Sequence, residues 1–285
     1  MKKCYQFAGI GICVYIPDER VYEDDRYLTP FRVEQPEDPE VFHFEMVPAL
    51  LPPQGNFVAT NGGLRVYDDG VYYLGSVMEG WELAYAQVLS NGKQHRVLLK
   101  ESEFSRQVGA NTVLNVLRAE HLTAMHGGFV FHSSMIRVGG KAILFTAPSG
   151  TGKSTQAALW EQHRAARIIN GDRSAVRWVE EQAFACGIPF AGSSNICNNE
   201  TLPLGAVVYL KQAPQNQLRR LRGAEAFRRI WEGCSVNTWD KTDVAAVSER
   251  VQQVVSAVPV FELACTPDQR AVECLEEALR QEGIL

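Results

Sequence analysis

The first third of the chain consists of short hydrophobic runs, several of which alternate with polar residues. Such runs, separated by turn-forming residues, are typical of β-strands. Asn91-Gly92 lies between two alternating segments and predicts a tight hairpin. The acidic, proline-containing stretch 17–40 predicts a long exposed loop, so residues 1–105 are expected to form a β-rich domain. The pattern predicts strands over 6–16, 41–47, 64–66, 71–77, 81–89 and 95–99.

From about residue 106 the pattern changes to a mixture of helices and strands. Apolar residues at helical spacing predict a helix over 110–125, which Gly127-Gly128 ends. Two strands over 129–138 and 141–146 follow, joined by Gly139-Gly140. We therefore expect the fold class to be α/β (α+β), with a mixed sheet in a domain over 106–285. The other elements predicted are strands over 167–170, 174–179, 184–189, 205–211 and 258–264, and helices over 154–163, 224–234, 243–257 and 267–281.

Composition narrows the class of protein. The 285 residues are 46% hydrophobic and 21% charged, which suits a globular chain. A formal net charge of −5 argues against general binding to nucleic acid. The apolar run near the start is short and contains Gly and Tyr, so we interpret it as a first strand rather than a secretion signal. No stretch reaches the ~18 apolar residues of a membrane span, so no membrane partner is expected.

The seven cysteines are scattered, and none forms a C-x-x-C pair. A dispersed, odd-numbered set predicts free, buried thiols in a reduced, cytoplasmic protein. Neither a disulfide framework nor a structural zinc site is expected from this spacing.

Residues 147–155 read Ala-Pro-Ser-Gly-Thr-Gly-Lys-Ser-Thr, between a predicted strand and a predicted helix. This is the context of a phosphate-binding loop, although Ala147 stands where the motif begins with glycine. Glycines without a Cβ let backbone amides approach phosphate oxygens, and Lys153 can reach the β and γ phosphates. The hydroxyl of Ser154 can ligate a metal, so ATP and Mg²⁺ are the expected cofactors. The predicted nucleotide-binding residues are Ser149, Gly150, Thr151, Gly152, Lys153, Ser154 and Thr155.

A phosphate loop needs an acidic partner, and Asp172 follows the next predicted strand, nineteen residues after Lys153. It is a candidate metal ligand or proton acceptor, while an ordinary turn residue in Asn-Gly-Asp is the alternative. His132, on the strand before the loop, can approach the γ phosphate or the metal, or it is simply a residue of the hairpin. Lys153, Asp172 and His132 are therefore the candidate catalytic residues, and Ser154 and Asp172 the candidate metal ligands.

The succession of His132, Gly139-Gly140, 147–155 and Asp172 resembles the HPr kinase/phosphorylase family. That family is related to ATP-type phosphoenolpyruvate carboxykinases. Residues 187–196 also look like divergent members that modify peptides. The resemblance covers about 120–285, but Gly171 stands where the family has a second aspartate. It implies an HPr serine kinase-like phosphotransferase and the assembly of several copies, while the residues themselves leave the oligomeric state open.

The function expected from the resemblance is transfer of the γ phosphate to a hydroxyl acceptor, either a serine of a peptide or protein or a small molecule. Two alternatives remain open. One is a regulatory protein that binds nucleotide with little or no hydrolysis, and the other is an enzyme like the carboxykinases. A basic cluster either forms a solvated face or binds an acidic peptide or a neighbouring subunit. Its members are Arg219, Arg220, Arg222, Arg228 and Arg229.

Overall fold

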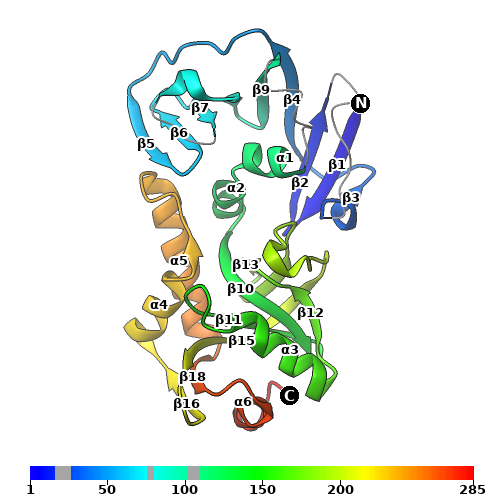
Figure 1. Ribbon diagram of the computed structural model, residues 1–285, viewed down its shortest axis with the longest axis vertical. Helices are drawn as coiled ribbons and strands as arrows, with labels where there is room; N and C mark the ends of the chain where they lie inside the picture. Colours follow the sequence, from blue (N-terminus) through cyan, green and yellow to red (C-terminus); the bar gives the residue numbers. More distant parts are fainter. Residues whose placement is uncertain (17–26, 76–79, 102–109) are drawn as a thin grey trace. The chain divides into compact units, whose positions relative to one another are not determined.

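The computed structural model describes residues 1–16, 27–75, 80–101 and 110–285. The chain divides into two compact units, Met1–Ala119 and Glu120–Leu285, each with its own nine-stranded sheet (Figure 1). The α/β class predicted from the sequence is confirmed. The predicted domain boundary at 105/106 lies outside the described residues. Within the described ranges, no helix has both the length and the hydrophobicity needed to cross a membrane.

The first unit is a sheet with the strand order β3-β1-β2-β4-β9-β8-β7-β6-β5. The predicted hairpin at Asn91-Gly92 is confirmed, because Asn91 pairs with Gln94 and Gly92 has a φ of 56°. The elements are β1 (Lys2–Phe7), β2 (Ile10–Tyr15), the 3-10 helix η2 (Thr29–Phe31), β3 (Arg32–Val33), β4 (Glu40–Val47), β5 (Phe57–Asn61), β6 (Leu64–Tyr67), β7 (Tyr72–Leu74), the 3-10 helix η3 (Trp81–Leu83), β8 (Ala86–Asn91), β9 (Gln94–Lys100) and α1 (Ala110–Leu117).

Several predicted elements differ in the structure. The single strand predicted over 6–16 is wrong, because the range contains the end of β1, a hairpin turn at Ala8-Gly9 with positive φ at both residues, and the whole of β2. The helix predicted over 110–125 is divided into α1 and α2 (Ala119–Met125), because Arg118 adopts a left-handed conformation that interrupts it. The strand β5 was not predicted. Residues 17–26 of the predicted loop, and 76–77 of the predicted strand over 71–77, lie outside the described residues.

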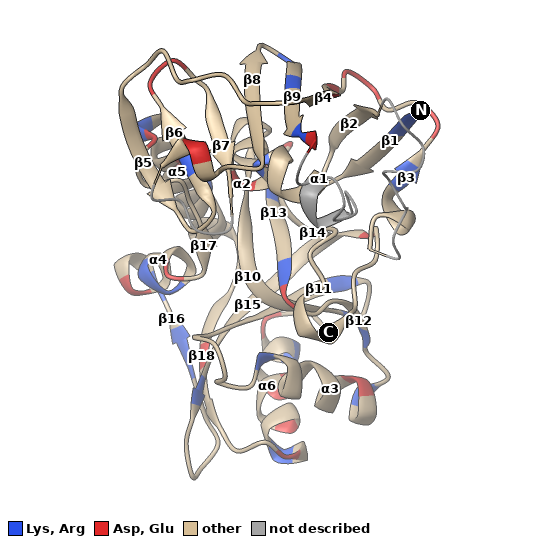
Figure 2. Cartoon of the chain, turned by 45° about the horizontal axis from the view of Figure 1, so that its top comes forward, with Lys and Arg blue, Asp and Glu red and all other residues tan. Residues whose placement is uncertain are grey.

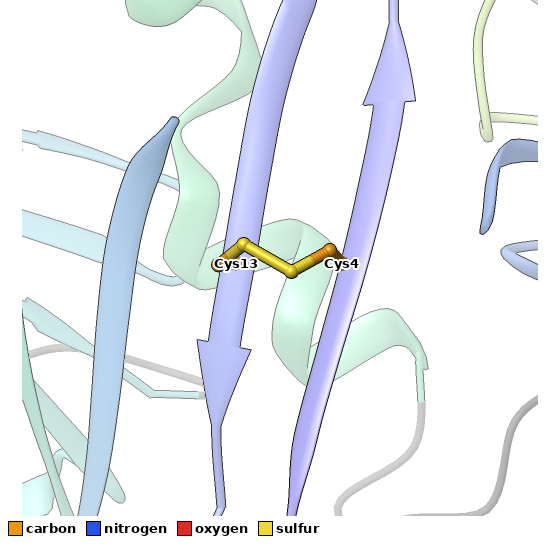
Figure 3. Close-up of a disulfide and its surroundings, with 2 residues drawn as sticks. All are labelled: Cys4 and Cys13. Atoms are coloured by element: carbon orange, nitrogen blue, oxygen red, sulfur yellow. A yellow bond between two sulfur atoms is a disulfide. The ribbon is translucent and has the colours of Figure 1, made fainter. Parts of the chain in front are cut away.

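The expectation that the cysteines are free thiols is wrong for two of the seven. A disulfide joins Cys4 to Cys13 across β1 and β2 (Figure 3). The two residues lie directly opposite each other in the antiparallel ladder, with 4.2 Å between their Cα atoms. The turn at Ala8-Gly9 sets this register, and it was missed because residues 6–16 were interpreted as a single strand. The remaining five cysteines are not disulfide-bonded.

The second unit contains a mixed sheet in the order β11-β10-β13-β14-β15-β18-β16, with β12 and β17 also paired to β10. β15 runs parallel to both β11 and β18, so the carboxyl ends of these three strands lie at one edge. Its strands are β10 (Gly128–Val138), β11 (Lys141–Thr146), β12 (Arg167–Asn170), β13 (Arg173–Val179), β14 (Gln182–Gly187), β15 (Thr201–Gln212), β16 (Gln217–Leu221), β17 (Cys234–Ser235) and β18 (Val260–Cys265). The helices after α2 are α3 (Lys153–Arg164), α4 (Gly223–Trp231), α5 (Lys241–Ala257) and α6 (Gln269–Gln281), and η5 (Gly192–Ser194) is a 3-10 turn.

Successive side chains of β11 enter two separate hydrophobic clusters. Ala142 and Leu144 pack with residues of α4 and α5, whereas Ile143 and Phe145 pack with residues of α3 and α6. Because side chains of a strand alternate between faces, the sheet is covered by helices on both sides. Burial on both faces explains the unbroken apolar run of this strand in the sequence. β11 ends at Thr146, where the loop over 147–152 begins.

The disulfide in the first unit gives a prediction about thiol content. The unreduced, denatured protein should titrate five thiols, and reduction should raise the number to seven. Replacing Cys4 and Cys13 by serine should lower the free energy of unfolding by about 2–3 kcal/mol, since the open chain has more conformational entropy. Urea unfolding of both forms measures this difference. Seven reactive thiols before reduction would contradict the pairing.

Candidate active site

The candidate site is built around two consecutive residues of β10, His132 and Ser133. On one side, the Ser133 N–H donates to the carbonyl of Asp172 at 3.0 Å. On the other side, β11 ends with Thr146 opposite Ser133, and the Thr146 hydroxyl donates to the His132 carbonyl at 3.0 Å. Because the loop over 147–152 follows Thr146, this pairing brings the loop, His132 and Asp172 to one place in the fold.

The loop over 147–152 connects β11 to α3. Gly150 and Gly152 have φ values of 77° and 119°, conformations that favour glycine. Since α3 begins at Lys153, the first amides of the helix have no partner within it, and its positive dipole end lies at the loop. Ala147, at the position where the motif begins with glycine, is buried, and its methyl group packs in the cluster under α3 and α6. The departure from the motif therefore adds to the core.

Lys153 is buried, with 8% of its surface exposed. Its ammonium donates to the carbonyl of Ala147 at 3.0 Å. Burial lowers the pKa of Lys153, and the negative charge of Asp172 opposes this shift. A buried cation whose hydrogen-bond partner is a neutral carbonyl is suited to an anionic ligand. Ser154 and Thr155 lie exposed on the first turn of the same helix.

Asp172 is the first acidic residue after α3, and its carboxylate lies near the side chains of His132 and Arg173. His132 Nε2 lies 3.5 Å from Oδ1, and Arg173 Nε lies 3.6 Å from Oδ2. The pKa of Asp172 is lowered mainly by the hydrogen bond from His132, against the effect of burial. The charges of Arg173 and Lys153 lower it further. The carboxylate is therefore ionised at neutral pH and can ligate a cation or accept a proton.

Gly171 has no room for a side chain. A Cβ at this position would lie 1.9 Å from Ser194 Oγ and 2.4 Å from Ser194 Cβ. Ser194 is held by its own turn, in which its hydroxyl donates to the Ala191 carbonyl at 2.6 Å. A Cβ on Gly192 would in turn lie 2.5 Å from the Cβ of Asp172. The turn over 191–196 is thus packed on the Gly171-Asp172 pair, and it occupies the space that a second aspartate would need.

The predicted binding residues fit a nucleotide and Mg²⁺. Ser149 and Gly150 are exposed, Thr151 and Gly152 are half-buried, and all belong to the loop whose glycines take positive φ. One contact to the loop was missed by sequence reasoning. The Gln212 amide, at the end of β15, lies 3.5 Å from the Gly150 carbonyl and 3.3 Å from that of Thr151. Its place at the end of a predicted parallel strand was the available signal.

The basic cluster is largely paired within the unit. Arg219 and Arg229 both contact Glu262, at 2.9 and 3.5 Å, and Arg220 pairs with Glu282. Figure 2 shows these basic residues along β16 and α4, with acidic residues among them. The strand β16 was itself missed, because no element was predicted between the strand over 205–211 and the helix over 224–234. Charge pairing of this kind is typical of a solvated face rather than of a free anion-binding surface.

A second polar cluster contains His121, Asp240 and Asp243, whose side-chain ligand atoms lie within 4.8 Å of one another. The two oxygens of Asp243 contact His121 Nδ1 and Asn237 Nδ2, each at 2.7 Å. Asp240 caps α5, where its side chain accepts from Thr242 N. These contacts connect α2 to the start of α5, so we assign the cluster to the structure of the unit.

The packing at Gly171 predicts the effect of restoring a second acid. Gly171→Asp should lower the free energy of unfolding by about 1–3 kcal/mol, because the new side chain displaces Ser194. In a Ser194→Gly background the same change should cost less than half as much, since the clashing atoms are gone. Urea unfolding of the four proteins in this cycle measures the coupling. Additive effects would show that Ser194 does not fill the space.

Comparisons with known proteins give only distant likenesses, all of them among solved structures. No family model matches the chain, and no curated protein matches it in sequence. Among the solved structures similar to it is that of the Hpr(Ser) kinase/phosphatase from Coxiella burnetii. The two share 12% identity with a TM-score of 0.33, over 54% of this chain and 97% of that chain. Likeness at this level identifies neither a family nor an activity, so the function rests on the geometry of the site.

Proposed function

We propose that the second unit binds ATP with Mg²⁺ and transfers the γ phosphate to a hydroxyl acceptor. The observation that carries this proposal is that the start of the loop and ionised Asp172 are held by adjacent residues of β10, while buried Lys153 is close enough to Asp172 for their charges to interact. Each group has the charge that phosphoryl transfer requires at the place where it acts.

The backbone amides of the loop and the first turn of α3 would bind the phosphate oxygens. Lys153 would leave the Ala147 carbonyl for the phosphates, where it would neutralise developing charge. Ser154 and Asp172 are the residues that would hold Mg²⁺, which supplies charge neutralisation when bound. An ionised Asp172 also serves as the base toward the acceptor hydroxyl, and its contact with His132 would fix its orientation.

The acceptor we propose is a serine hydroxyl of a peptide or protein, with a small hydroxyl compound as the alternative. The turn over 191–196 packs on Asp172, so the acceptor would approach beside this turn. Ser193 is exposed there. The cytoplasm, where ATP and Mg²⁺ are abundant, is the proposed location.

A second candidate function is a regulator that binds nucleotide without transferring phosphate. It is favoured by Gly171, where packing against Ser194 leaves space for a single carboxylate at this strand end. The two candidates share the binding step and differ in the transfer step, so they are separated by separate measurements of binding and of transfer.

Replacing Lys153 by alanine should weaken ATP binding by about 10- to 100-fold, because charge-assisted hydrogen bonds to the phosphates are lost. Isothermal titration calorimetry measures the dissociation constant. Lys141→Ala is the matched control, because Lys141 lies at the other end of β11 and its Nζ contacts the Gly283 carbonyl. Equal affinities in the Lys153→Ala and native proteins would refute the nucleotide site.

Asp172→Asn should keep ATP affinity within a few-fold and lower phosphate transfer by about 10²- to 10⁴-fold, the usual contribution of a general base. Transfer from γ-labelled ATP to an array of serine peptides and small hydroxyl compounds provides the measurement. Asp240→Asn is the control, since asparagine also caps a helix well. Undiminished transfer in Asp172→Asn would refute its role, and ATP binding without transfer in the native protein would favour the regulator.

A further inference from the structure

A cavity of about 620 Å³ lies beside the phosphate loop, at the edge of the sheet where β11, β15 and β18 end. Ligands of α/β proteins bind outside the carboxyl ends of parallel strands. The volume falls in the usual range for small-molecule sites, about 300–1,000 Å³. The lining residues come from the loop and α3 (Gly150, Thr151, Gly152, Thr155, Gln156), from β15 and its end (Leu210, Gln212, Ala213), and from β18 and its following loop (Cys265, Pro267).

Gln156 in the wall of this cavity has an unused hydrogen-bonding group. The residue is 2% exposed, and its Nε2 donates to Cys265 Sγ at 3.3 Å. Its Oε1 is buried and has no hydrogen-bond partner among the described residues. A buried amide oxygen without a donor destabilises the protein, so its presence in a cavity wall points to a donor that a ligand supplies.

The cavity is continuous with the proposed phosphate site. Gly150 and Gly152 belong to the loop and also line the cavity. Gln212 lines it too, and its amide contacts the carbonyls of Gly150 and Thr151. A ligand whose phosphates bind the loop amides would therefore carry the rest of its structure next to this cavity.

We propose that the cavity binds the base of the nucleotide and that the amide of Gln156 recognises adenine. This inference rests on the proposed function. Adenine presents an amino donor beside a ring-nitrogen acceptor, and a glutamine amide offers the complementary acceptor and donor. The corresponding edge of guanine presents two acceptors, which would leave Oε1 unpaired. Leu210 and Pro267 supply apolar surface for the faces of the ring.

The test compares ATP, GTP and inorganic tripolyphosphate by calorimetry, because tripolyphosphate engages the loop without a base. The native protein should bind ATP about tenfold more tightly than either of the others, the value of one good pair of hydrogen bonds. Gln156→Leu should lose this preference, because the binding of ATP alone becomes weaker. Gln252→Leu, a change at an exposed glutamine of α5, should leave all three affinities unchanged.

Ala213→Trp is a second variant, which fills the cavity from its half-buried rim and leaves Gln156 in place. It keeps the inference testable if Gln156→Leu does not fold. This variant should weaken the binding of ATP but not that of tripolyphosphate. The adenine site is overturned if the native protein binds GTP more tightly than ATP. It is also overturned if these variants lose affinity for ATP and for tripolyphosphate to the same extent. ATP binding that depends on Lys153 but not on Gln156 overturns this inference and leaves the proposed function standing. Failure of the native protein to bind ATP overturns both.

Discussion

The backbone of β10 pairs along both of its edges, and the candidate site depends on this. One edge pairs with β12 and then β13, and Gly171-Asp172 lie between these two strands. The other edge pairs with β11, which ends at Thr146. A strand presents its amides and carbonyls to alternate sides, so consecutive residues can hold different partners. Ser133 binds Asp172 and His132 binds Thr146 in this way. A side-chain hydrogen bond from Thr146 and a backbone hydrogen bond to Asp172 therefore hold the start of the loop and the acid to β10.

The second feature of the site is the burial of two opposite charges, Lys153 and Asp172. Burial lowers the pKa of Lys153 and acts to raise that of Asp172, while the charge of each group opposes the effect of burial on the other. Desolvated charges are costly unless a partner compensates them. The N-terminus of α3 and the charge of Lys153 together create a positive potential at the end of β11, beside a loop whose glycines have positive φ. Such a potential favours a polyanion, and Asp172 limits it on the side where a cation would bind.

The turn over 191–196 explains the most informative departure from the resembling family. A side chain at position 171 is excluded, because Ser194 fills the space that it would use. Asn170 adds to this arrangement, since its side chain donates to the Ile188 carbonyl and its backbone pairs with Cys197. The packing therefore allows only one carboxylate, that of Asp172, at this strand end. A second acid at position 171 would also require a change in the turn over 191–196.

Local patterns in the sequence determined much of the second unit. The apolar run of β11, the glycines of the loop and the helix that follows are recognised within a few residues of one another. In the first unit, the hairpin at Asn91-Gly92 is recognised in the same way. Contacts between distant segments could not be predicted in this way. Gln156 meets Cys265, 109 residues later, and Ser194 meets Gly171. The disulfide between Cys4 and Cys13 depended on where one turn fell. Local propensity determines which elements form, whereas only their packing decides which side chains share a cavity, a charge or a bond.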